Sequence, residues 1–212
     1  MKYLLITLGF ITSLAFAQSD EKSDKILNQL SKEIKALNSF YLEFNMKINN
    51  PSTGEDSNQN GKGYVQGDKF NAELGDNLII SNGLKVWTVV KDSKVVYESD
   101  ADEDDNETMN PKQLMTIWET GFKNKYDKET TFNNKKVHVI NLYPTNPGEV
   151  QYHTIILYIN QDNNELAKAI MKTKDGSKMT YEVTKFSKNV EVTKDKFVYD
   201  ARKYPGYQLI RD

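Results

Sequence analysis

The stretch FYLEFNMKIN, residues 40–49, alternates apolar side chains with mostly polar ones over ten positions. Successive side chains of a β-strand point to opposite faces of its sheet, so this alternation predicts a strand with one apolar face. That face needs a cover from elsewhere in the chain. The apolar positions are Phe40, Leu42, Phe44, Met46 and Ile48.

Short apolar runs and turn residues then repeat along most of the chain. Asn82-Gly83 and Asp175-Gly176 are hairpin signals, because Asn, Asp and Gly tolerate a positive φ. A turn-rich stretch is expected from Asn50 to Gly61. We predict about ten or eleven antiparallel strands, with residues 152–159 as a central strand, apolar on both faces, and residues 190–198 as the last.

Two amphipathic helices are expected beside these strands. The first begins at an Asp20 or Ser19 cap, and its apolar stripe is Ile26, Leu27, Leu30, Ile34 and Leu37. The second begins at Asn110-Pro111, ends at Gly121, and has Leu114, Met115, Ile117 and Trp118 on its apolar side.

A sheet of this many strands curls, so one of its faces is concave. We therefore predict an α+β fold in which a curled antiparallel sheet forms an incomplete β-barrel, with amphipathic helices as a lid on the concave face. Helices packed tightly there would make an ordinary core, whereas a loose cover would leave a pocket. Periodicity leaves both possibilities open.

The N-terminal residues are typical of an export signal. Lys2 precedes an apolar run from Tyr3 to Phe16, and Ala15-Phe16-Ala17 offers small residues at a cleavage site. We expect a signal peptide at residues 1–17 and a single domain at residues 18–212. The chain has no cysteine for a disulfide or for lipid attachment, so we expect a soluble periplasmic protein.

Charge and residue types argue against several functions. The 28 Lys and Arg nearly balance the 30 Asp and Glu, without the basic surplus of a nucleic-acid binder. The two histidines, His138 and His153, belong to no evident nucleophile–base or metal-ligand pattern, so a hydrolase is disfavoured. The acidic run Asp100–Glu107 lacks the glycine and terminal glutamate of a calcium loop. It is expected to be a solvated loop or a docking site for a basic partner surface. No enzyme activity and no cofactor are expected.

Several motifs, in order, resemble one known family. They are the Phe40–Ile48 strand, residues 61–65 (GKGYV) leading to residues 67–70 (GDKF), residues 79–83 (IISNG) leading to Val86-Trp87, residues 110–114 (NPKQL), and residues 197–200 (FVYD) before residues 203–206 (KYPG). Together they resemble the LolA family of periplasmic outer-membrane lipoprotein carriers, in the form common in the Bacteroidota. The resemblance covers nearly all of the expected mature chain.

The resemblance implies a fold, a function and a set of partners. Family members have an incomplete barrel whose apolar cavity shields the acyl chains of lipoproteins. They take this cargo from an inner-membrane ABC transporter and deliver it to the outer membrane, where an acceptor protein can receive it. We expect this chain to act as a monomer. The same scaffold would also suit a carrier of another amphiphile, such as a glycolipid or phospholipid, or a sensor or interaction module that detects stray lipoprotein.

The resemblance also implies which residues form the cavity and its lid. Some family members carry an arginine that holds the lid closed, but the matching stretch here is Gly67-Asp68-Lys69, and Lys69 is a weak substitute. Phe70 matches a cavity-side phenylalanine of the family. The expected cavity and lid residues are Phe40, Leu42, Phe44, Met46, Phe70, Ile80, Trp87, Leu114, Met115, Trp118, Ile156 and Tyr158.

Overall fold

The structure, a computed structural model, describes residues 20–101 and 115–211. One twelve-stranded sheet dominates it, in the order β12-β6-β5-β4-β3-β2-β1-β11-β10-β9-β8-β7. The elements in chain order are α1 (Glu21–Lys35), β1 (Ser39–Asn50), β2 (Glu55–Gln66), β3 (Lys69–Leu74), β4 (Asn77–Ser81), β5 (Lys85–Val90), β6 (Val95–Asp100), η1 (Ile117–Glu119), β7 (Phe122–Phe132), β8 (Lys135–Pro144), β9 (Tyr152–Asn160), β10 (Leu166–Thr173), β11 (Lys178–Lys188), η2 (Lys194–Phe197), η3 (Ala201–Lys203) and β12 (Gln208–Arg211).

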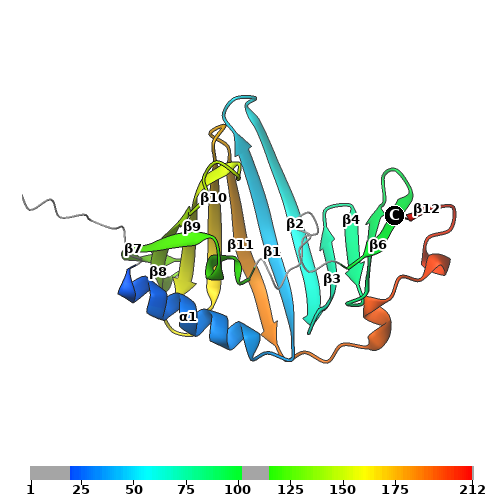
Figure 1. Ribbon diagram of the computed structural model, residues 1–212, viewed down its shortest axis with the longest axis horizontal. Helices are drawn as coiled ribbons and strands as arrows, with labels where there is room; N and C mark the ends of the chain where they lie inside the picture. The colour runs from blue at the N-terminus through cyan, green and yellow to red at the C-terminus, as the bar shows by residue number, and fades with distance from the viewer. Residues whose placement is uncertain (1–19, 102–114, 212) are drawn as a thin grey trace, which may run out of the picture.

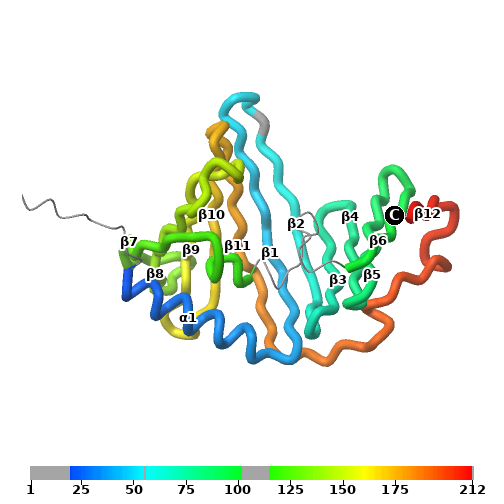
Figure 2. Tube along the Cα trace, viewed as in Figure 1, coloured from blue at the N-terminus to red at the C-terminus, as the bar shows by residue number. Residues whose placement is uncertain are grey.

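The sheet curls but does not close, because its end strands β7 and β12 do not pair with each other. Figure 1 shows α1 lying across the strands on the β7–β11 side, while β3 to β6 form the other arm. The long strands β1 and β2 stand between the two arms (Figure 2). The expected incomplete barrel is confirmed, with α1 as the one α-helix among the described residues.

Helix α1 begins where the sequence predicts. The Asp20 side chain accepts hydrogen bonds from the backbone N–H groups of Lys22 at 2.9 Å and Ser23 at 3.4 Å. Leu27, Leu30 and Ile34 recur on one side of the helix and are almost completely buried. Burying each such side chain is worth roughly 1.5–3 kcal/mol, so this stripe holds the helix on the sheet.

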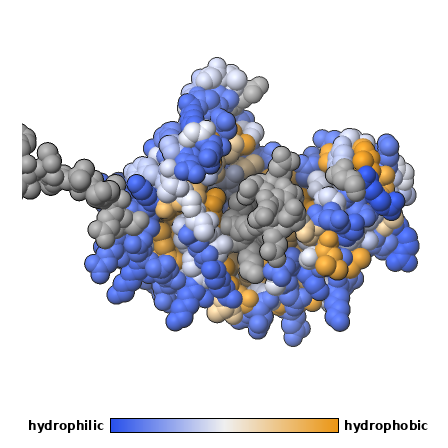
Figure 3. All heavy atoms as spheres, in the orientation of Figure 1, coloured by the Kyte–Doolittle hydropathy of each residue, from blue (hydrophilic) through white to orange (hydrophobic). Residues whose placement is uncertain are grey.

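We call the face of the sheet that packs against α1 the inner face. Its buried apolar side chains come from β1 and from strands on both sides of it, so one cluster runs across the middle of the sheet. In the space-filling view, hydrophobic patches show on the β7–β11 side and on the arm of β3 to β6, within a surface that is mostly hydrophilic (Figure 3). The strand members of the cluster are Phe40, Leu42, Val65, Phe70, Ile140, Leu142, Ile155, Leu157 and Ile159.

A second apolar cluster lies on the opposite, outer face of β4, β5 and β6. Its buried members include Ile80, Trp87 and Val89, and half-buried tyrosines near the C-terminus pack against it. Tyr199 stacks on Trp87 with ring centroids 6.2 Å apart. The C-terminal segment therefore covers the outer face of this arm, and β12 then pairs with β6 in parallel (Figure 1).

Two expectations about elements are wrong, and one strand had not been predicted. Residues 190–198 are not a strand: the chain leaves the sheet after β11, and Phe197 is buried beside β3, where the Asn71 side-chain amide donates to the Lys196 carbonyl at 2.9 Å. The parallel strand β12 was not expected. The turn after β1 is also shorter than predicted, because the polar residues of β2 pair with β1 from Glu55 onward.

The structure also differs from the helix predicted between Asn110 and Gly121. Residues 110–114 lie outside the described part of the chain, and from Met115 to Gly121 the backbone forms only a turn and the short 3-10 helix η1. The apolar side chains Met115 and Trp118 are nevertheless buried, as the amphipathic pattern predicts.

Candidate functional site

Most of the predicted cavity residues on β1 and β3 lie on the inner face. Phe40, Leu42 and Phe70 are buried in the inner cluster, and Phe44 packs against it half-buried. Met46 follows on the same side of β1 and is also buried. Met115 and Trp118 join the cluster from the turn before β7, whereas Leu114 lies outside the described residues.

Four predicted cavity residues lie on the outer face. Ile80 and Trp87 belong to the outer cluster beneath the C-terminal segment, where the Trp87 indole N–H donates to Glu98 at 3.1 Å. Ile156 and Tyr158 alternate with inner-face residues of β9 and so point outward. These strands are apolar on both faces, so their composition does not reveal which residues point inward.

The neighbours of these four residues occupy the inner face instead. Ile79 packs against the inner cluster beside Ala72, and Ile155 and Leu157 are buried in it. Met171 pairs with Ile155 across β9 and β10 and is half-buried there. The signal that could have found them is cross-strand register: pairing Phe44 with Gly61 and Val65 with Phe70 fixes which side of each next strand faces inward.

Two glycines of β2 allow close packing on the inner face beside β1. A Cβ atom added to Gly61 would lie 2.1 Å from the Phe44 ring, so that ring lies directly on the β2 backbone. A Cβ atom on Gly63 would lie 3.2 Å from the Asn71 carbonyl oxygen. Residues 61 and 63 are successive inward positions of β2, and glycine at both lets the Phe44 ring and the β3 backbone approach the β2 backbone closely.

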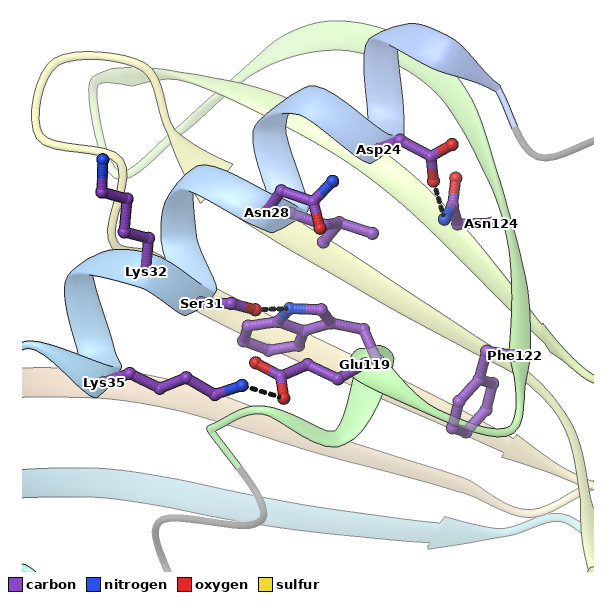
Figure 4. A pocket seen from close by; sticks show the side chains of 10 residues that line it. Asp24, Asn28, Ser31, Lys32, Lys35, Glu119, Phe122 and Asn124 are labelled. Atoms are coloured by element: carbon purple, nitrogen blue, oxygen red, sulfur yellow. Dashed lines mark hydrogen bonds and ion pairs between the residues drawn. The ribbon is translucent and has the colours of Figure 1, made fainter.

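The turn containing η1 is tied directly to α1. The Trp118 indole N–H donates a buried hydrogen bond to the Ser31 hydroxyl at 2.8 Å, and Lys35 Nζ lies 2.6 Å from Glu119 Oε2 (Figure 4). Partial burial acts to raise the pKa of Glu119, but hydrogen bonds from Lys35 and Ser31 outweigh it and lower that pKa below its ordinary value. Lys69 is exposed and has no described partner, so these contacts on α1, rather than Lys69, hold the turn.

Ser31→Ala should therefore destabilise the protein. It leaves the Trp118 N–H buried without an acceptor, which costs about 1–3 kcal/mol. Lys35→Ala is the control, since it removes an ion pair whose lysine is largely exposed and is worth ~1 kcal/mol or less. Urea unfolding followed by circular dichroism measures both, and equal losses in the two variants would contradict the role given to Ser31.

A groove lies between α1, η1 and the start of β7, with a volume of about 630 Å³ (Figure 4). We call it the α1–β7 groove. Leu27, Trp118 and Phe122 form its apolar lining, and Asn28 and Lys32 are among its polar lining residues. At one end, the Asn124 side-chain amide donates to Asp24 at 2.6 Å and the Ser23 hydroxyl bonds to Asn124, which joins helix and strand.

The two histidines contact ordinary polar neighbours. His138 Nδ1 lies 3.0 Å from the Tyr126 hydroxyl, and partial burial lowers the pKa of His138. Lys22 of α1 bonds to Glu129 at 3.1 Å and lies over the Tyr126 ring, so this cluster links the helix to β7. His153 is exposed and contacts the Thr154 hydroxyl.

Within residues 20–101 and 115–211, no cluster of three or more histidine or acidic side chains is arranged to hold a metal ion. In the same part of the chain, no helix has the length and apolar character needed to cross a membrane.

Solved structures from several bacteria align with most of this chain. An uncharacterized conserved protein from Thermus thermophilus aligns with a TM-score of 0.61 at 10% identity, covering 91% of this chain and 100% of that one. A DUF1329 family protein from Desulfovibrio piger has a TM-score of 0.48 at 12% identity, with 86% and 98% of the two chains covered. A LolA superfamily protein from Nitrosomonas europaea has a TM-score of 0.44 at 12% identity, with 83% and 97% covered.

Sequence comparison identifies the family. No curated protein matches the chain. The family model described as outer membrane lipoprotein carrier protein LolA matches residues 35–200, which include β1 to β11. This match covers most of the chain and confirms the resemblance found in its motifs. The chain therefore belongs to the LolA family of outer membrane lipoprotein carrier proteins.

Proposed function

We propose that this protein carries acylated lipoproteins through the periplasm and shields their acyl chains on the inner face of its sheet. In this proposal, residues 1–17 direct export, and the single domain that follows acts as a monomer. It receives cargo from an inner-membrane ABC transporter and delivers it to the outer membrane. Family membership and the apolar inner face support the proposal.

The observation that carries the proposal is the apolar inner face itself. Beside its fully buried core lie half-buried apolar side chains on strands from both arms, including Phe44, Ala72, Ile79, Met171 and Val183. Among the described elements, α1 packs against the β7–β11 side of this face. Half-buried apolar side chains can bind an acyl chain and release it again, whereas the side chains of a permanently packed core cannot.

The energetics fit a carrier that must both hold and release its cargo. Each methylene of an acyl chain is worth about 0.8 kcal/mol when it is removed from water, so a free chain does not leave a membrane unaided. A protein surface that buries part of the acyl chain lowers the free-energy cost of taking the chain out of the membrane. The methionines Met46, Met115 and Met171 lie on or beside this face, and their flexible side chains adapt to chains of different shape.

Isolation of the protein from periplasm without detergent tests this proposal. We expect mass spectrometry to find acylated N-terminal peptides bound to it, and we expect the purified protein to release lipoproteins from spheroplasts. Bound glycolipid or phospholipid instead would indicate a carrier of another amphiphile. Lipoprotein binding without release would indicate an interaction module, and lipid-free protein that releases nothing would refute carriage altogether.

A further inference from the structure

The α1–β7 groove combines an apolar lining with unused hydrogen-bonding groups. Its volume of about 630 Å³ is within the range of ligand sites in proteins, roughly 300–1,000 Å³. Leu27 and Trp118 line the groove and also belong to the inner-face cluster. The groove therefore adjoins the apolar face on which we place the acyl chains, so a molecule with an apolar and a polar part could occupy both.

The polar groups of the groove suit a neutral chain with many donors and acceptors. Within the described part of the chain, neither the Asn28 amide nor the Lys32 ammonium has a hydrogen-bond or ion-pair partner. An asparagine side chain both donates and accepts. The polypeptide backbone has the same requirement, since each residue other than proline carries one N–H donor and one C=O acceptor.

The charges of the groove favour a peptide over an anionic lipid headgroup. Lys32 and Lys35 line it together with Asp24 and Glu119, so two positive side chains stand against two negative ones. Lys35 is already paired with Glu119 at 2.6 Å. A phosphate would meet carboxylates beside the lysines, whereas a peptide of no net charge meets no such repulsion.

We infer that the α1–β7 groove binds the polypeptide segment that directly follows the acylated residue of the cargo. This inference rests on the proposed lipoprotein-carrier function and extends it from the acyl chains to the protein part of the cargo. The acyl chains lie on the inner face, and the first residues of the attached protein pass between α1 and the turn at η1, where Asn28 bonds to their backbone.

The experiment compares two synthetic probes by isothermal titration calorimetry. One is a triacylated cysteine amide with no following residue, and the other is the same acylated cysteine followed by five neutral, polar residues. We expect the wild-type protein to bind the lipopeptide about tenfold more tightly, the gain that one or two net hydrogen bonds provide. Asn28→Trp, which fills the groove, should remove this gain and leave the affinity for the cysteine amide unchanged.

Gln29→Trp is the matched control. Gln29 is the next residue of α1, is exposed, and does not line the groove. The Gln29→Trp protein should keep the tenfold preference for the lipopeptide over the cysteine amide. Circular dichroism of both variants checks that α1 is intact.

The outcomes separate this inference from the proposed function. If the wild-type protein binds both probes equally, or if Asn28→Trp keeps the preference, the groove does not bind the peptide. If Asn28→Trp instead weakens binding of a phosphatidylglycerol probe, the groove is a headgroup site and the inference is wrong. If the wild-type protein binds neither acylated probe, lipoprotein carriage itself fails, and the inference fails with it.

Discussion

Leu30→Ala should lower the free energy of unfolding by about 2–5 kcal/mol, the range measured when a buried leucine is truncated in a packed core. Leu30 is 2% exposed and lies in the middle of the α1 stripe, between Leu27 and Ile34. Its truncation removes apolar contacts and leaves a cavity between helix and sheet. Because many domains have only about 5–15 kcal/mol of stability in total, this is a large share.

The chain supplies a control with the same chemical change. Leu84 lies in the turn between β4 and β5 and is 77% exposed, so Leu84→Ala should change stability by no more than about 0.5 kcal/mol. Urea unfolding, followed by circular dichroism, gives both values. A loss below about 1 kcal/mol for Leu30→Ala would mean that α1 does not depend on its packing against the inner face.

Met171→Glu should abolish most of the capture of acylated cargo while the protein stays folded. Met171 is half-buried on the inner face of β10, beside Ile155 of β9 and Met179 of β11. A carboxylate there holds water at the surface where we place the acyl chain. Binding the chain would require removing that water from the charged group, and this desolvation lowers the affinity for the chain. We expect an affinity loss for the triacylated cysteine amide of at least about tenfold.

Thr180→Glu is the control for this variant. Like Met171, Thr180 is half-exposed. It pairs with Ile170, the neighbour of Met171 along β10. Neighbouring residues of a strand point to opposite faces, so the Thr180 side chain lies on the outer face of the same part of the sheet. Thr180→Glu introduces the same negative charge as Met171→Glu but leaves the inner face unchanged. Equal losses of affinity in the two variants would indicate a general effect of charge and would contradict the assignment of the acyl site.

Local patterns predicted much of the fold. The cap at Asp20 and the stripe of Leu27, Leu30 and Ile34 lie within a few residues of one another, so spacing along the chain defines α1. Alternation along β1 likewise identified its inward side chains, because polar residues occupy the opposite face. Turn residues separated most of the remaining strands.

Prediction failed where the two faces of a strand are alike or where contacts are distant. Ile80 and Trp87 point outward because the C-terminal tyrosines cover the outer face of their arm, which no local pattern indicates. The strand predicted at residues 190–198 is absent, and Phe197 instead anchors a segment that leaves the sheet. β12 was missed because its partner β6 lies more than a hundred residues earlier in the chain.

The sequence by itself determined the helix, the strand alternation and the apolar character of the inner face, because these depend on interactions between near neighbours in the chain. Its motifs also indicated the family. Only the tertiary structure decided which side of each doubly apolar strand faces inward, because register is set by pairing with other strands. It alone joined Trp118 to Ser31 across 87 positions and formed the α1–β7 groove, since long-range packing brings these groups together.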